Sequence, residues 1–163
     1  MIIRTNDKVH SGKYIVEVLK SKDKELNVVE VDKIYYPYCI VIYRVKMNNP
    51  NSSLNRRVLC VIDMVTGRGS IGDGEPELAE IEVDDVQVVD VGLTPEQIVD
   101  KAHDYVFKEV MSKLRVLNVP ELTLESAEYF HKLFYVVHCK DKAGKDYFLL
   151  GDSIEAKFTE LAS

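Results

Sequence analysis

Three glycines form the most suggestive chemical motif in the chain. Gly67, Gly69 and Gly72 follow the apolar run "VLCVIDMV" with the spacing G-x-G-x-x-G, and Asp90 lies 18 residues further on. In a dinucleotide-binding site such glycines open a helix whose positive end holds a pyrophosphate. Here the glycine loop continues as "GDGEPE", which contains a proline and three carboxylates that repel phosphate. The motif therefore favours a loop that leaves a hairpin, where positive φ is needed, over a nucleotide site.

Cysteine and histidine, the other residues suited to catalysis, are few. Cys39, Cys60 and Cys139 lie in apolar runs and form no C-x-x-C pair, which indicates buried free thiols rather than metal ligands. His138 is adjacent to Cys139, and on a strand the two point to opposite faces, which excludes a local nucleophile–base pair. We therefore predict no catalytic residue, cofactor or metal. A small enzyme with a cleft between two halves of the chain is the alternative, because distant residues can also assemble a site.

An acidic segment is the strongest remaining functional feature. Residues 69–100 contain ten acidic residues and no basic one. It is interpreted as a contact surface for a basic protein partner, as a cation site on a loop, or as a solvated edge strand whose charges prevent aggregation. In the last case the inward-facing residues are Ile81, Val83, Val86, Val88 and Val91. The candidate partner-binding residues of this segment are Asp73, Glu75, Glu77, Glu80, Glu82, Asp84 and Asp85.

Three tyrosines form a second candidate contact. Tyr35, Tyr36 and Tyr38 surround Pro37 in "YYPY". Because proline lacks an N–H group, Pro37 suggests an edge position or a bulge where a strand begins. The tyrosines either pack beneath a helix or form an exposed aromatic patch for a protein partner.

Other partner classes find no support in the sequence. The basic residues are scattered, so no nucleic-acid partner is predicted. No apolar run approaches the roughly 18 residues of a membrane span, and no secretory signal is visible at the N-terminus. We therefore expect a cytoplasmic protein without a membrane partner.

Two similar segments suggest the elements that position these residues. "IYYPYCIVIYRVK" (34–46) and "EYFHKLFYVVHCK" (128–140) are 94 positions apart, and each alternates as a β-strand does. One face is wholly apolar in both, comprising Cys39, Val41, Tyr43 and Val45 in the first and Leu133, Tyr135, Val137 and Cys139 in the second. A turn and a second apolar run follow each segment, which predicts two long hairpins.

A helix is predicted before each hairpin. Thr94 to Gln97 has the form of a capping box, and Val99, Ala102, Val106, Val110 and Leu114 form an apolar stripe at helical spacing. In the first half, residues 11–22 favour a short helix, while alternation over 13–19 leaves a strand as the alternative. We expect each helix to cover one face of its own hairpin.

The end of the first hairpin carries a family resemblance. The run "YRVKM…RRVLCVIDMVTGRG", with Asp63, Thr66 and Gly67 closing a strand in a tight turn, resembles PepSY-type modules, which are small cystatin-like helix-plus-sheet domains. The second half keeps Asp152 but has Glu155 and Ala156 where threonine and glycine are expected. The resemblance covers about 30 residues and implies a tandem of non-catalytic binding modules.

The sequence as a whole predicts an α+β protein of two similar helix-plus-antiparallel-hairpin halves, packed as a pseudo-duplicated unit. The expected boundaries are 1–78 for the first half, 79–91 for an acidic connecting strand, and 92–163 for the second half. The expected function is a non-catalytic protein-binding or adaptor module that acts through a sheet edge, an aromatic patch or the acidic strand. A homodimer formed by sheet-edge pairing is a further expectation.

Overall fold

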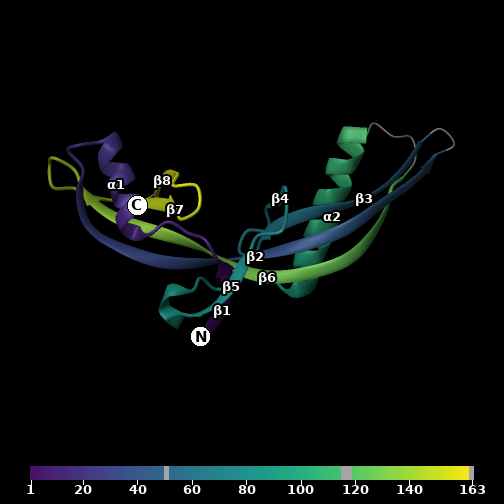
Figure 1. The fold of residues 1–163 in the computed structure, drawn as a ribbon, viewed down its shortest axis with the longest axis horizontal. Coiled ribbons are helices and arrows are strands. Elements are labelled where there is room, and N and C mark those ends of the chain that lie inside the picture. The colour runs from purple at the N-terminus through teal and green to yellow at the C-terminus, as the bar shows by residue number, and fades with distance from the viewer. Residues whose placement is uncertain (50–51, 115–118, 162–163) are drawn as a thin grey trace. The chain divides into compact units, whose positions relative to one another are not determined.

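The computed structural model describes residues 1–49, 52–114 and 119–161 and has an α+β fold with two helices and a large mixed sheet (Figure 1). The helices are α1 (Gly12–Lys22) and α2 (Pro95–Leu114), and a 3-10 turn, η1, spans Asp85–Gln87. The strands are β1 (Ile2–Asn6), β2 (Asn27–Asn49), β3 (Ser52–Asp63), β4 (Gly69–Ile71), β5 (Leu78–Glu82), β6 (Glu121–Lys140), β7 (Asp146–Asp152) and β8 (Phe158–Leu161). Among the described residues, neither helix combines the length and the apolar character needed to cross a membrane.

Both helices begin with a capping hydrogen bond, and the sequence predicts the cap at Thr94. Ser11 accepts the N–H of Tyr14 at 3.2 Å, and residues 13–19 are helical rather than extended. Thr94 and Gln97 exchange two hydrogen bonds, of 2.9 and 3.2 Å, which confirms the capping box. Among the side chains that the structure describes, the buried stripe of α2 consists of Ile98, Ala102, Val106 and Val110, and the predicted Leu114 lies outside them. Val99 is only half-buried, so its place in the predicted stripe was wrong, because Ile98 is the residue four positions before Ala102.

The chain forms two compact units that are built from interleaved segments. Unit 1 comprises residues 1–36, 77–89 and 131–163, and unit 2 comprises residues 37–76 and 90–130. The long strands β2 and β6 each contribute one part to each unit. The units therefore differ from the continuous ranges 1–78, 79–91 and 92–163.

Unit 2 is a helix packed on an antiparallel sheet. β2 pairs with β3 from Tyr38–Asp63 to Asn49–Ser52, and β4 continues the sheet beyond β3. The buried stripe of α2 packs against the apolar faces of β2 and β3, where the core residues are Cys39, Val41, Tyr43, Val45, Cys60 and Ile62, and against Met64, which directly follows β3. The predicted apolar face of residues 39–45 is confirmed.

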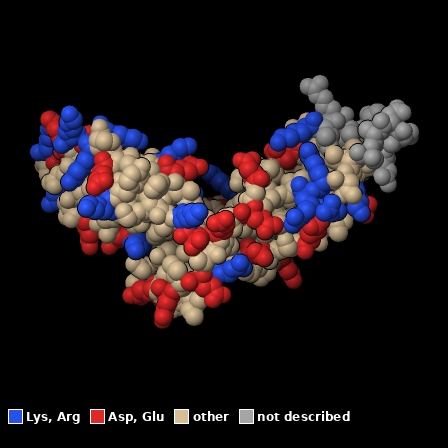
Figure 2. Space-filling view, in the orientation of Figure 1, with Lys and Arg blue, Asp and Glu red and all other residues tan. Residues whose placement is uncertain are grey.

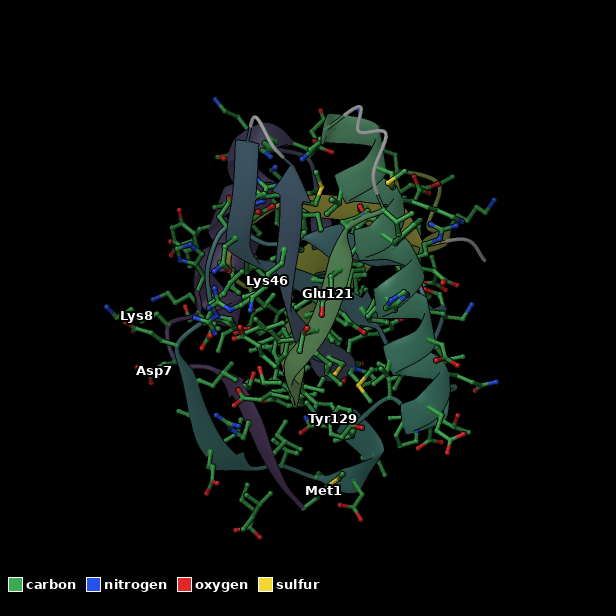
Figure 3. The ribbon with its side chains drawn as sticks, turned by 90° about the vertical axis from the view of Figure 1, so that its right-hand side faces the viewer. Met1, Asp7, Lys8, Lys46, Glu121 and Tyr129 are labelled. Carbon is green, nitrogen blue, oxygen red and sulfur yellow. The ribbon has the colours of Figure 1, made fainter. Side chains whose placement is uncertain are left out.

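Unit 1 also contains one helix packed on strands. α1 contributes Ile15 and Leu19 to a core that also contains Leu133, Tyr135, Val137 and Cys139 of β6, with Phe158 of β8 packed against it. β6 pairs with β7, and β7 with β8. Figure 3 shows β1, between the labelled Met1 and Asp7, beside β5, its antiparallel partner. β1 also meets β6 in parallel at Thr5–His131.

Each helix thus packs on the hairpin of the other half, which corrects the expectation that it covers its own. The reason is strand length. β2 has 23 residues, so its first part stays beside α1 while its second part forms the hairpin of unit 2. β6, with 20 residues, passes in the same way from unit 2 into unit 1. Pro37 lies inside β2 and not at its start, since the strand begins at Asn27.

Candidate functional site

Most of the acidic residues lie on the short edge strand β5 and in the loops before and after it. β5, which ends the strand order and pairs with β1, exposes Glu80 and Glu82 and turns Ile81 toward the core of unit 1. The strand stops at Glu82 and η1 follows, so Val86 is 87% exposed and Val91 48% exposed. The prediction that these two valines face inward was wrong, whereas Ile81, Val83 and Val88 do pack against the core. Acidic side chains gather over β5 and η1 in the lower part of Figure 2.

Several of the acidic candidates already interact within the protein. Glu75 lies 3.4 Å from Arg57. Asp84 accepts the N–H of Val86 at 3.2 Å, and Asp85 lies 3.6 Å from the N-terminal ammonium group. Asp73, Glu77, Glu80 and Glu82 are exposed. Within the described residues, no group of three or more His, Cys, Asp or Glu is arranged to hold a metal ion.

The three tyrosines pack against other residues. Tyr35 is 5% exposed and belongs to the core of unit 1. Tyr36 is half-buried and meets Phe134 edge to face, with ring centres 6.3 Å apart. Tyr38, also half-buried, stacks on Phe130 at 5.7 Å. Tyr35 is thus a core residue, whereas the rings of Tyr36 and Tyr38 each pack on one aromatic ring of β6.

The cysteines and the glycine loop have the structural roles that their surroundings predict. All three thiols are fully buried and free. Burial raises the pKa of Cys39 to about 11 and that of Cys60 to about 12, which is the opposite of what a nucleophilic thiolate needs. Gly67 has φ +81°, and strand β4 follows it where a nucleotide site requires a helix. Cys139 lies in the core, whereas His138 lies on the other face and contacts Asp146 at 2.8 Å.

A groove in unit 1 combines an apolar floor with basic walls. It has a volume of about 540 Å³ and lies between α1 and β2. Val16, Val31 and the ring of Tyr135 supply apolar lining. Gly12 opens one end, because a side chain there would begin 3.4 Å from Tyr135 and 3.7 Å from Val31. Such a volume lies within the range of about 300–1,000 Å³ that is typical of ligand sites.

Lysines dominate the charge of this groove. Lys13 and Lys20 extend from α1 and Lys33 from β2, and all three are exposed. Within the part of the chain that the structure describes, none of them has a carboxylate at ion-pair distance. Glu17 is the one acidic residue in the lining. Basic side chains over α1 appear at the left of Figure 2.

A second cavity adjoins the groove and shares Lys33 and Tyr135 with it. It measures about 410 Å³ and is lined by β1, β2, β5, β6 and the loop before α1. Two of its side-chain oxygens, Thr5 Oγ1 and Asn6 Oδ1, are buried without a hydrogen-bond partner. Buried polar atoms usually have a partner, so this cavity has unused hydrogen-bonding capacity.

Sequence reasoning missed the basic groove. Lys13 and Lys20 are seven residues apart and so lie on one face of α1, a signal that the sequence does contain. Lys33 joins them only because β2 runs beside the helix. Comparison of the chain with protein-family models, curated proteins and solved structures gave no match.

Proposed function

We propose that the protein is a non-catalytic peptide-binding module that adds an extended segment of a protein partner to the open edge of β2 in unit 1. In this mode of recognition, main-chain hydrogen bonds to a sheet edge provide affinity, and pockets for alternate side chains provide specificity. The observation that carries the proposal is the coincidence of a long unpaired strand edge with an apolar groove.

The open edge is residues 27–34 of β2. β2 pairs with β3 only from Tyr38 onward, and its other partner is β6. On the side away from β6, the edge of β2 is next occupied at Tyr35. This residue forms a bridge with Val88, and its carbonyl oxygen accepts the N–H of Val89 at 3.0 Å. Eight residues between Asn27 and Ile34 therefore have no strand on this side within the described chain. Unpaired N–H and C=O groups of such an edge bind extended chains readily.

The other strands at sheet edges support this choice. β4, β5 and β8 have three, five and four residues, and short edge strands are a common means of preventing unwanted pairing. β5 also exposes Glu80 and Glu82. The open part of β2 is longer, and the groove under α1 lies directly beside it.

We also propose that the two halves are PepSY-like or cystatin-like repeats, packed as a pseudo-duplicated unit with exchanged helices. Asp63 Oδ1 accepts the N–H groups of Val65 and Thr66 at 2.8 and 3.0 Å. Asp152 Oδ1 accepts those of Ile154 and Glu155, 89 positions later, at 2.8 and 3.1 Å. The strand pairs that follow keep the same offset, since Ile62 pairs with Gly69 and Gly151 with Phe158.

The long strands β2 and β6 support the same proposal, but their equivalent positions are separated by a different number of residues than those of the two turns. Asp63 pairs with Tyr38 and Asp152 with Phe134, so the equivalent positions of β2 and β6 differ by 96. The offset of 94 read from the sequence is two residues short. The even difference leaves each side chain on its expected face.

Hydrogen–deuterium exchange with a neutral peptide tests the proposed function. The probe is the blocked octapeptide Gln-Thr-Val-Thr-Gln-Thr-Val-Thr, which is long enough to cover residues 27–34. We expect slower amide exchange in residues 27–34 at millimolar peptide and unchanged exchange in β5. Unchanged exchange along β2 at saturating peptide would contradict the proposal.

A matched pair of glycine variants tests the place of binding. Gly12→Leu puts a side chain into the groove, and its first carbon makes ordinary contacts there. Gly74→Leu adds the same side chain where no atom lies within 4 Å. The first variant is expected to abolish the protection of residues 27–34 while remaining folded, and the second to leave it unchanged.

A further inference from the structure

We infer that the segment bound at the edge of β2 is acidic on the side that faces α1. This inference rests on the proposed function and names the chemistry of the partner. It is carried by the three lysines of the groove, none of which has a carboxylate at ion-pair distance among the residues that the structure describes.

The positions of the lysines match the geometry of an added strand. Lys13 and Lys20 are seven residues apart on α1, which corresponds to about 10 Å along the helix. Side chains four residues apart on an extended strand lie on one face and are about 13 Å apart. Two carboxylates at such positions therefore reach the two ends of the groove, with an apolar side chain between them above Val16 and Val31.

The groove attracts an anion because its net formal charge is positive. Three ammonium groups and the carboxylate of Glu17 line it. Lys13 and Lys20 are also close to the apolar floor, so their aliphatic stems can cover it while their charged ends meet the ligand. A basic segment would bring like charges together at this site, which costs affinity.

The face of β2 that points away from the groove disfavours acidic side chains of the partner segment. Asp32 lies between Val31 and Lys33, which both line the groove, so strand alternation directs its exposed carboxylate away from the groove. An acidic residue on that side of the partner segment meets Asp32. The favoured segment therefore alternates, with acidic and apolar residues toward α1 and neutral or basic residues on the other side.

Binding of three matched peptides tests this inference. The blocked octapeptides have the sequence X-Thr-Val-Thr-X-Thr-Val-Thr, with X as Glu, Gln or Lys. By calorimetry at about 20 mM NaCl, we expect the Glu peptide to bind about tenfold more tightly than the Gln peptide and the Lys peptide to bind most weakly. At about 500 mM NaCl the difference should shrink to about twofold.

Two triple variants with the same net charge separate local from overall electrostatics. Lys13→Gln, Lys20→Gln and Lys33→Gln together should remove the preference for the Glu peptide. The control variant replaces three exposed lysines elsewhere, Lys46, Lys108 and Lys145, by Gln and should keep the preference. Glu17→Gln should strengthen binding of the Glu peptide about twofold, because it removes the one carboxylate of the lining.

The outcomes distinguish the inference from the proposed function. Equal affinities for the three peptides, with residues 27–34 still protected from exchange, would overturn the acidic preference and leave the edge-binding function in place. Loss of the preference in both triple variants would also overturn the inference. If none of the peptides protects residues 27–34, or if these residues are protected only as a second copy of the chain associates, the proposed function itself fails.

Discussion

Ile15 of α1 lies against Gly151 of β7, so close that a side-chain carbon at position 151 would be 3.2 Å from Ile15 Cγ2. The two residues are 136 positions apart, and their contact places the first helix on the last hairpin. Gly151→Ala is expected to lower the free energy of unfolding by about 1–2 kcal/mol, because the added methyl group would lie 3.0 Å from Phe158 Cε1 as well as 3.2 Å from Ile15 Cγ2.

A double-mutant cycle makes this prediction specific. Ile15→Ala removes Cγ2, the atom that faces position 151, and should cost about 2–5 kcal/mol in the native background and less when Ala is present at position 151. Urea unfolding measures the four free energies. Strict additivity would contradict the packing of α1 on β7.

Two turns with the same pattern of hydrogen bonds to an aspartate provide opposite predictions for an exchange between glycine and alanine. Gly67 has φ +81° and Ala156 has φ +52°, and each lies four residues after the aspartate that closes its turn. Ala156→Gly should raise the free energy of unfolding by up to about 1 kcal/mol, because glycine adopts positive φ without a steric penalty.

Gly67→Ala should be destabilising by about 1–2 kcal/mol, since alanine is unfavourable at this φ. Its Cβ would also lie 2.5 Å from Lys101 Cδ, so the lysine side chain has to move. Thermal unfolding of both variants checks the pair. The same direction of change in both would mean that the two turns are not alike.

The local elements could be predicted from the sequence, whereas their partners could not. The capping box of Thr94 and the alternation of residues 39–45 are short-range signals, and both were correct. Nothing in these signals says which hairpin a helix covers, because both hairpins offer the same apolar face. α1 was ambiguous because its buried stripe consists of only Ile15 and Leu19.

The candidate site likewise depends on long-range contacts that the sequence does not report. The acidic residues are close together in the sequence and were predicted as a contact surface, but several of them contact groups of the same chain. The lysines of the groove come from two elements, and the open edge beside them exists because the hairpin of β2 lies in the other unit. A strand edge depends on long-range pairing, which local patterns do not report.

The acid stability of unit 1 should depend on Asp152. Burial alone would raise the pKa of this carboxyl, but hydrogen bonds from Lys132, at 2.6 Å, and from the N–H groups of Ile154 and Glu155 hold it below its ordinary value of 3.8. Folding therefore favours the ionised form. The stabilisation is complete above the pKa of the unfolded chain and is lost as the pH falls through the lower pKa of the folded state.

Asp152→Asn keeps an acceptor for the turn and removes the ion pair with Lys132. We expect it to lower the free energy of unfolding by about 1–2 kcal/mol at pH 7, with the difference from the native protein shrinking as the pH falls below 3.8 and through the lower pKa of the folded state. Urea unfolding from pH 2 to pH 7 measures this. A difference that stays constant over the whole range would exclude the ionised carboxylate as the cause.

The thiols should be unreactive in the folded protein. Cys39, Cys60 and Cys139 are fully buried, and burial raises the pKa of each. We expect a disulfide reagent such as Ellman's reagent to modify none of them at pH 8 within minutes and all three in strong denaturant. Rapid modification of one thiol in native protein would instead indicate a reactive cysteine and favour the enzyme alternative.

Methylation of the peptide backbone tests the central claim, addition of a strand to β2, most directly. Along an extended segment, every second N–H group faces the strand beside it, so N-methylation of one alternate set removes the hydrogen bonds to residues 27–34. We predict that methylating a single amide of this set weakens binding of the Glu peptide about tenfold or more, and that methylating an amide of the other set changes it less than about threefold. An effect that shows no alternation along the peptide would contradict strand addition to β2.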